Sequence, residues 1–468
     1  MSSFRIALVE SGASSTHIFS RTYLPRTGIP TLGAVLKEKG FACDIWFETM
    51  APVPQNLLRT YDIVGIGSTS STIPQAYRLA DAMKGKGPIV VMGGPHVTFM
   101  PDEALNHCDY VVMGEGEGTL PALVAALESK GSLEHIKGLA FRSADGSVHR
   151  TGKADPVDFP RLPSPDYSLC KEISPRKIPP IITTSRGCPH DCTFCSVTTM
   201  FGKKYRFKEI DQVIAELQPV LTRSVCFGDD NFFAHPVRTK ALLRAMIERD
   251  SVPLRWSGEM AVRAGLDEEL LDLMAATHCR IVYVGIESVN PETLKSYGKA
   301  HQFEATARCI DNLHRYGIGI HGMFVVDLDD TPETIEKIVD YAIETDIDTI
   351  QICSLTPFPG TEAHRKHGAR LLHNDWQYFD GMHVVARPTR CTAYELQTGI
   401  VDSLKRFYSP LRVFSSYRRN RGWRVKYRAG GHVLINRWAL ENRGYLSRLK
   451  NDYYTEPFPV KEAAFEAV

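Results

Sequence analysis

The chain has 468 residues, of which 43% are hydrophobic and 23% are charged, and its formal net charge is +1. This length suffices for two to four domains of about 100–200 residues each. The near-neutral charge argues against a protein that binds polyanions over its whole surface. The sequence starts without a basic segment followed by an apolar one and has no apolar run of about 18 residues. We therefore expect a cytoplasmic protein with neither a secretory signal nor a membrane span.

The first 150 residues alternate short β-branched runs with segments of helical period. Strands are expected at residues 5–10, 42–48, 62–69, 88–94 and 109–115. Strands that alternate with helices at this spacing predict an α/β domain with a doubly wound, Rossmann-like parallel sheet.

Ligands bind such a sheet at the carboxyl ends of its strands. The chain is glycine-rich and polar at three of these ends, as loops that approach a large ligand should be. The residues concerned are Ser68, Thr69, Ser70, Gly93, Gly94, Pro95, His96, Glu115, Gly116 and Glu117. The alternative is that they form only tight turns between strand and helix. The stretch "GEGEG" at 114–118 is not the G-x-G-x-x-G fingerprint of dinucleotide sites.

The rest of the chain divides into three parts. Residues 151–179 are expected to be a linker with little regular structure, since residues 151–180 contain seven prolines. Residues 180–387 contain six strand-helix units, which predict a parallel partial (β/α)6 barrel. Residues 388–468 are expected to form a small, basic, mainly helical region.

The basic character of this last region is concentrated in residues 404–450, which hold thirteen Lys or Arg against one acidic residue, Glu441. Such a run is most often a solvated helical face. It also suits a phosphorylated or polyanionic substrate, or peripheral contact with an anionic membrane.

Three of the eleven cysteines, Cys188, Cys192 and Cys195, lie within eight positions after the first strand of the predicted barrel. In a reducing compartment such a cluster indicates a metal site rather than disulfides. Structural zinc normally takes four protein ligands, whereas thiolates also suit iron–sulfur clusters. A cubane cluster held by three cysteines leaves one iron open for catalysis. A zinc-stabilised binding module is the alternative, and the eight scattered cysteines are expected to be buried apolar residues.

The spacing Cys-x3-Cys-x2-Cys, with Phe194 before the third cysteine, resembles the signature of the radical S-adenosylmethionine superfamily. The resemblance implies a 4Fe-4S cluster that binds S-adenosylmethionine at its open iron. An electron from a donor such as flavodoxin or ferredoxin then cleaves the sulfonium to a 5′-deoxyadenosyl radical. The cofactors carry this chemistry, and the protein orients them.

The resemblance also implies residues that bind S-adenosylmethionine at the ends of the next strands. They are Asp229, Asp230 and Asn231 after the second strand, Glu259 and Arg263 after the third, and Glu287 after the fourth. The first group departs from the family's Gly-Gly-Glu pattern, so the choice between Asp229 and Asp230 stays open. The alternative for each residue is an ion-paired or capping role at the barrel rim.

Together the two halves resemble radical S-adenosylmethionine enzymes with an N-terminal cobalamin-binding domain. That group includes cyclase-like proteins of the anaerobic magnesium-protoporphyrin ester type, hopanoid-modifying enzymes and many C- and P-methyltransferases. The segments that carry the resemblance are "LPRTGIPTLGAVLKEKG", "GGPHVT" and "VVMGEGEGTLPALV". It implies cobalamin bound at residues 68–70, 93–96 and 115–117. No Asp-x-His-x-x-Gly occurs in the first 150 residues, so we expect no histidine ligand below the cobalt.

The resemblance favours an oxygen-sensitive methyltransferase that acts on an unactivated carbon of a small molecule or lipid. The alternatives are a radical cyclisation, rearrangement or oxidation without methyl transfer, and a non-catalytic regulator that binds the cluster or cobalamin. A nucleic-acid substrate is disfavoured, because the N-terminal domain lacks the further cluster cysteines of the methylthiotransferases that modify transfer RNA. The sequence assigns no catalytic side chain and no substrate.

Overall fold

The computed structural model describes residues 4–13, 25–299, 303–418 and 422–459. By its internal contacts the chain forms two compact units. The first consists of Met1–Asp191, Cys195–Ala234 and Ala241–Trp256, and the second of Cys192–Phe194, His235–Lys240 and Ser257–Val468. The domain boundaries expected at residues 150, 179 and 387 stay predictions.

The first unit contains a seven-stranded sheet with the strand order β2-β1-β3-β4-β5-β6-β7. Its strands are β1 Arg5–Glu10, β2 Ala42–Phe47, β3 Ile63–Gly67, β4 Ile89–Gly93, β5 Tyr110–Val112, β6 Leu139–Arg142 and β7 Val148–Arg150. The pairs from β2 to β5 are all parallel. This part confirms the predicted doubly wound α/β sheet.

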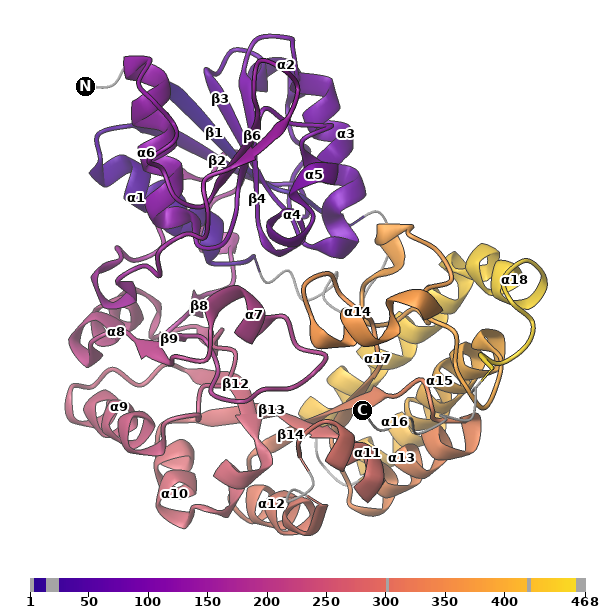
Figure 1. The fold of residues 1–468 in the computed structure, drawn as a ribbon. Helices are drawn as coiled ribbons and strands as arrows, with labels where there is room; N and C mark the ends of the chain where they lie inside the picture. The colour runs from indigo at the N-terminus through magenta and orange to yellow at the C-terminus, as the bar shows by residue number, and fades with distance from the viewer. Residues whose placement is uncertain (1–3, 14–24, 300–302, 419–421, 460–468) are drawn as a thin grey trace, which may run out of the picture. The chain divides into compact units, whose positions relative to one another are not determined.

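Burial on both faces explains why these runs become central strands. Ile6, Ala7, Leu8 and Val9 of β1 are almost completely buried, as in parallel sheets that helices cover on both sides. Helices α1 (Gly28–Glu38) and α6 (Gly116–Ser129) lie on one face, and α3 (Ile73–Met83) lies on the other (Figure 1). Helix α3 buries residues at helical spacing, namely Ile73, Ala76, Leu79, Ala80 and Met83.

The antiparallel strands β6 and β7 were not expected from the sequence. They form a hairpin in which Ala140 pairs with Arg150 and Arg142 with Val148. The turn between them holds Asp145, whose carboxylate accepts a 2.9 Å hydrogen bond from the Ser147 amide, and Gly146 at φ +84°. The Asp-Gly dipeptide is a hairpin signal, so this signal in the sequence was missed.

The expected linker contains only the short 3-10 turns Phe159–Arg161, Tyr167–Leu169 and Pro175–Lys177, apart from irregular chain. It is nevertheless packed, because Cys170 and Ile178 join the hydrophobic core around Ile45 and Leu36.

The second sheet has the strand order β8-β11-β12-β13-β14-β15, which runs with the chain as the predicted barrel requires. Its strands are β8 Ile181–Ile182, β11 Ser224–Phe227, β12 Arg255–Ala261, β13 Cys279–Glu287, β14 Gly319–Val326 and β15 Thr349–Ser354. The helices between them are α8 Ile210–Leu217, α9 Pro236–Glu248, α10 Glu268–Ala276, α12 Phe303–Arg315 and α13 Pro332–Glu344. All six predicted strands are present, although the first is shorter than expected.

Between β8 and β11 the chain inserts a short antiparallel pair, β9 (Ser185–Arg186) with β10 (Arg206–Phe207). The segment between these two strands carries Cys188, Cys192 and Cys195 and the helix α7 (Val197–Phe201). The expected first barrel strand, residues 179–185, therefore divides into β8 and β9.

The C-terminal region is mainly helical, as expected, with α15 Ala393–Phe407, α16 Pro410–Arg418, α17 Gly422–Glu441 and α18 Arg443–Asn451. Part of its basic charge is internal. Arg424 and Arg428 of α17 are buried, and Arg424 forms ion pairs with Asp346 and Asp348. Arg428 donates to the carbonyl oxygens of Ile347 and Asp348. Within the described ranges, no helix combines the length and apolar character needed to cross a membrane.

Asp348 should be essential for docking α17. Replacing it by alanine leaves Arg424 buried with reduced compensation and removes the acceptor for the Ile320 amide. We expect Asp348→Ala to lower the free energy of unfolding by about 3 kcal/mol. Arg437→Ala, which breaks only the exposed pair with Glu441, should cost less than about 0.5 kcal/mol. Equal urea midpoints for the two variants would contradict this role.

Candidate functional site

The strand order of the first sheet reverses between β1 and β3, which is where ligands bind in doubly wound sheets. The predicted residues at this edge are partly engaged with one another. The ring Nδ1 of His96 lies 3.1 Å from the Ser70 hydroxyl, and its Nε2 lies 3.4 Å from a carboxylate oxygen of Glu103. His96 is fully buried. Both ring nitrogens therefore face protein groups.

Ser68 is the residue at this edge that best fits a bound ligand. Its side chain is buried, and its hydroxyl has no hydrogen-bond partner within the described part of the chain. The adjoining backbone is tightly packed, because Gly94 has φ +107° and a Cβ there would lie 2.3 Å from the Ser68 carbonyl oxygen. A buried hydroxyl without a partner costs stability. It suits the amide-rich periphery of cobalamin, so the residues present fit this cofactor.

Three further polar residues at this edge were missed by the sequence analysis. Ser11 donates to the Gly67 carbonyl oxygen, and its hydroxyl lies 3.0 Å from that of Thr72. Glu10 is the last residue of β1 and is buried. Burial raises the pKa of its carboxyl group, and the positive charge of Arg26 offsets only part of this increase. No sequence motif marks these residues, because only the fold brings residues 10–11 beside residues 67–72.

Cys188, Cys192 and Cys195 of the loop are all partly exposed residues. Across the described ranges, no group of three His, Cys, Asp or Glu side chains is positioned to hold a metal ion. The assignment of Cys188, Cys192 and Cys195 as ligands therefore stays a prediction. Their chemistry fits it, since thiols are the preferred ligands of iron–sulfur clusters.

The other cysteines differ in environment. Six of the eight are buried, as expected, while Cys226 and Cys353 are partly exposed. Burial raises the pKa of Cys108 and of Cys309 to about 12. Such thiols stay protonated and are poor metal ligands.

The two aspartates after β11 have different surroundings. The carboxylate of Asp229 is buried and accepts hydrogen bonds from the backbone amide and hydroxyl of Thr184 and from the Ser185 hydroxyl. Asp230 is less enclosed and accepts a hydrogen bond from the Gly187 amide. Burial and the neighbouring Asp229 raise its pKa to about 6. Asp229 thus supports the strand that leads to the cysteines, and Asp230 is the better candidate for a ligand contact.

The remaining predicted residues fall into several environments. Asn231 is buried, with its side-chain oxygen 3.3 Å from the Phe233 amide. Glu259 and Arg263 are exposed at the end of β12 and just beyond it. In the second unit, the Phe194 ring packs edge-to-face on Tyr297, with 5.1 Å between ring centres.

Glu287, at the carboxyl end of β13, shows two signs of a specialised position. Its backbone has φ +66°, beside a register shift between Gly285 and Glu287, and its carboxylate lies 2.6 Å from the Lys299 ammonium. A non-glycine residue held in the left-handed region costs free energy and is found preferentially at functional sites. That Glu287 contacts S-adenosylmethionine stays a prediction. In the structure, the partner of the Glu287 carboxylate is Lys299.

A second feature missed from the sequence is a buried ion-pair network in the first unit. The Glu115 carboxylate accepts hydrogen bonds from Arg186 at 2.7 Å and from Arg206 at 2.8 Å, and Glu117 accepts one from Arg186 at 2.7 Å. All four side chains are at most 13% exposed. Two residues predicted to line the cobalamin site thus bind arginines on either side of the cysteine loop.

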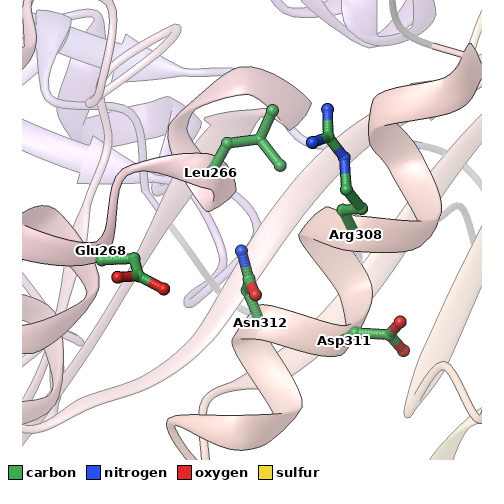
Figure 2. Close-up of a pocket in the computed structure, with 5 residues that line it drawn as sticks. All are labelled: Leu266, Glu268, Arg308, Asp311 and Asn312. Carbon is green, nitrogen blue, oxygen red and sulfur yellow. The ribbon is translucent and has the colours of Figure 1, made fainter.

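A separate open pocket lies in the second unit, at the surface of α10 and α12, with a volume of about 330 Å³. Figure 2 shows its lining residues, Leu266, Glu268, Arg308, Asp311 and Asn312. None of these is a predicted site residue, and side chains of both charges line the pocket.

Comparison with known proteins now decides the family. Residues 20–124 match the family model of the B12 binding domain, and residues 182–342 match that of the radical SAM superfamily. The chain belongs to the radical SAM enzymes that carry an N-terminal B12-binding domain. The resemblance drawn from the sequence, the order of the two folds and the expected cofactor set are confirmed.

The relatives of this radical SAM enzyme include a methyltransferase and a cyclase. The chain is 29% identical over 390 residues to bacteriochlorophyllide d C-12(1)-methyltransferase of Chlorobaculum tepidum, covering 80% of this chain and 81% of the relative. It is 26% identical over 411 residues to anaerobic magnesium-protoporphyrin IX monomethyl ester cyclase of Rubrivivax gelatinosus, covering 82% and 74%. The solved structure of the radical S-adenosylmethionine methyltransferase TsrM from Kitasatospora setae, with cobalamin and a 4Fe-4S cluster bound, has the same fold. Its TM-score is 0.66 at 21% identity, covering 79% of this chain and 78% of TsrM.

The network around Glu115 gives a pH dependence of stability. Burial raises the pKa of Glu115, but hydrogen bonds from Arg206 and Arg186 outweigh this and hold it below the usual 4.5. A carboxylate with a depressed folded-state pKa stabilises the fold above its unfolded pKa, and this contribution is lost as the pH falls through the folded value. The difference in unfolding free energy between wild type and Glu115→Gln should therefore be constant near neutral pH and shrink below about pH 4.5. Urea titrations across this range measure it, and a difference independent of pH would contradict the assignment.

Proposed function

We propose that this protein methylates an unactivated carbon of a small molecule or lipid, using a 4Fe-4S cluster, S-adenosylmethionine and cobalamin. The observation that carries the proposal is the pairing of a B12-binding domain with a radical SAM domain in one chain. It is supported by the similarity to a methyltransferase over four fifths of each chain.

Cys188, Cys192 and Cys195 would hold the cluster. When bound, the cluster with S-adenosylmethionine supplies a carbon radical, and cobalamin supplies a methyl carrier. The protein's part is to orient these groups and exclude water. Asp230 would contact S-adenosylmethionine, since the carboxylate of Asp229 is already used by Thr184 and Ser185. Glu259, Arg263 and Glu287 complete the proposed binding set at the ends of β12 and β13.

At the cobalamin site, the proposed contacts are made by residues 68–70 and 93–96. Ser68 offers a buried hydroxyl without a protein partner among the described residues. The tight approach of Gly94 to the Ser68 carbonyl oxygen fixes the backbone of this edge. A preformed edge of this kind binds a large cofactor with little reorganisation.

A second candidate function is a radical cyclisation without methyl transfer, which the similarity to the anaerobic cyclase favours. The mass of the product separates the two functions, because methyl transfer adds one CH2 unit to the substrate. A reduced flavodoxin or ferredoxin is the proposed electron donor for both. Peripheral membrane contact through the exposed basic residues of the C-terminal region remains part of the proposal.

The deciding experiment is anaerobic production in cells supplied with cobalamin, followed by measurement of cobalamin, iron and sulfide per chain. Near-stoichiometric cobalamin together with reductive formation of 5′-deoxyadenosine supports methyl transfer. A protein without cobalamin that still cleaves S-adenosylmethionine would contradict it and leave the cyclisation in the lead.

Replacing the proposed cluster ligands tests the metal site. Cys188→Ala, Cys192→Ala and Cys195→Ala should each lose most of the iron and all reductive cleavage of S-adenosylmethionine, because three thiolates are the minimum set for this cluster. Cys226→Ala is the matched control, as Cys226 is also partly exposed but lies in β11. Iron analysis and 5′-deoxyadenosine assays measure both effects. Full iron content in a ligand variant would remove that cysteine from the set.

Ser68→Ala should affect stability and cobalamin binding in different ways. Removing a buried hydroxyl without a partner should leave the free energy of unfolding unchanged or raise it by up to about 1 kcal/mol. If the hydroxyl bonds to cobalamin, the dissociation constant should rise about tenfold, which corresponds to about 1.4 kcal/mol. Ser71→Ala, at a partly exposed serine nearby, is the control. Unchanged cobalamin affinity of Ser68→Ala would exclude the contact.

A further inference from the structure

The segment that carries the cysteines begins and ends next to two paired arginines. In the antiparallel pair of β9 and β10, Arg186 lies directly opposite Arg206. The chain between them, residues 187–205, contains Cys188, Cys192 and Cys195. Any group that fixes both arginines therefore fixes the two ends of this loop.

Like charges directly opposite each other on paired strands repel. Here the side chains are also buried, so their charges need compensation. Glu115 supplies it to both arginines, with distances of 2.7 Å to Arg186 and of 2.8 and 3.0 Å to two nitrogens of Arg206. Its other contact is with the Val157 amide at 3.1 Å.

Glu117 completes the compensation at Arg186, which thereby binds two carboxylates with its two terminal nitrogens. The Arg186 guanidinium also lies over the rings of Phe159 and Phe201, at 4.8 and 5.4 Å from the ring centres. Two carboxylates thus balance two guanidinium groups in a largely buried site. A lysine would not reproduce this geometry, because it offers a single ammonium nitrogen where the planar guanidinium offers two terminal nitrogens in a fixed fork.

The backbone that follows Arg186 has little freedom to absorb a displacement. Gly187 has φ +88°, and a Cβ at this position would lie 2.7 Å from the Lys204 carbonyl oxygen. Its amide donates to Asp230. A shift of Arg186 is therefore transmitted to Cys188, two residues further on.

We propose that Arg186 is a positioning residue for the iron–sulfur cluster, and that Glu115 and Glu117 of the B12-binding domain set the geometry of the cysteine loop through it. Glu115 binds the arginines at both ends of the loop and Glu117 binds the one at its start, so the glutamates act on the loop and not by touching the cluster. The proposal rests on the proposed function, since it takes the three cysteines as cluster ligands.

The experiment compares Glu117→Gln, Arg186→Lys and Glu216→Gln in the full chain, purified anaerobically with its cluster. Glu216→Gln is the matched control, because it weakens a similarly buried pair with Lys208 in the same unit that involves neither Arg186 nor Arg206. The readouts are the electron paramagnetic resonance spectrum of the reduced cluster and the rate of iron loss to a chelator, both without cobalamin or substrate. Thermal unfolding of each variant monitors general stability.

Glu117→Gln and Arg186→Lys should change the spectrum and speed iron loss about tenfold, the size typical of groups that orient metal ligands. Glu216→Gln should lose comparable thermal stability yet keep the wild-type spectrum and rate. Spectra and rates of Glu117→Gln that match those of Glu216→Gln would overturn the positioning role while leaving the proposed function intact. A wild-type chain that holds no 4Fe-4S cluster would instead overturn the proposed function.

Discussion

The need to compensate buried charge is the constraint on which the described site depends. Arg186 and Arg206 face each other across a two-residue strand pair, and this arrangement is stable only with carboxylates between them. Glu115 and Glu117 come from the start of α6, far away in the sequence. The loop that bears the cysteines is therefore held by a part of the chain that belongs to the B12-binding domain.

The same physical rule shapes the C-terminal region of the second unit. Arg424 and Arg428 are buried against Asp346 and Asp348, between the end of α13 and the start of β15. Part of the basic charge of this region therefore lies inside the protein, where it fixes helix α17 to the rest of the unit. Other basic residues of the region, such as Lys426 and Lys450, are exposed.

How well a site residue could be predicted depends on whether the signal for it lies in the neighbouring sequence or only in the folded structure. Cys188, Cys192 and Cys195 could be predicted as cluster ligands from the sequence, because their spacing is itself the signal, and this assignment stays a prediction. Asp229 and Asp230 could not be told apart, since only the fold places Thr184 and Ser185 against the first and leaves the second less enclosed. Glu115 and Glu117 were placed at a cofactor edge, but their arginine partners are about 70 to 90 residues away in the chain and no local pattern pairs them. Ser68 was named with its neighbours, and only burial singles it out.

The sequence by itself determined the order of strands and helices, the two-part α/β organisation and the family. The reason is that hydrophobic periodicity and cysteine spacing are local properties, which need no tertiary contact to be recognised. The hairpin of β6 and β7 was not predicted, although the sequence contains the Asp-Gly dipeptide of its turn. Tertiary structure alone decided which partner each of these carboxylates binds. Ion pairs and burial depend on groups that meet only after folding, and the cost of burying a charge is set by that final environment.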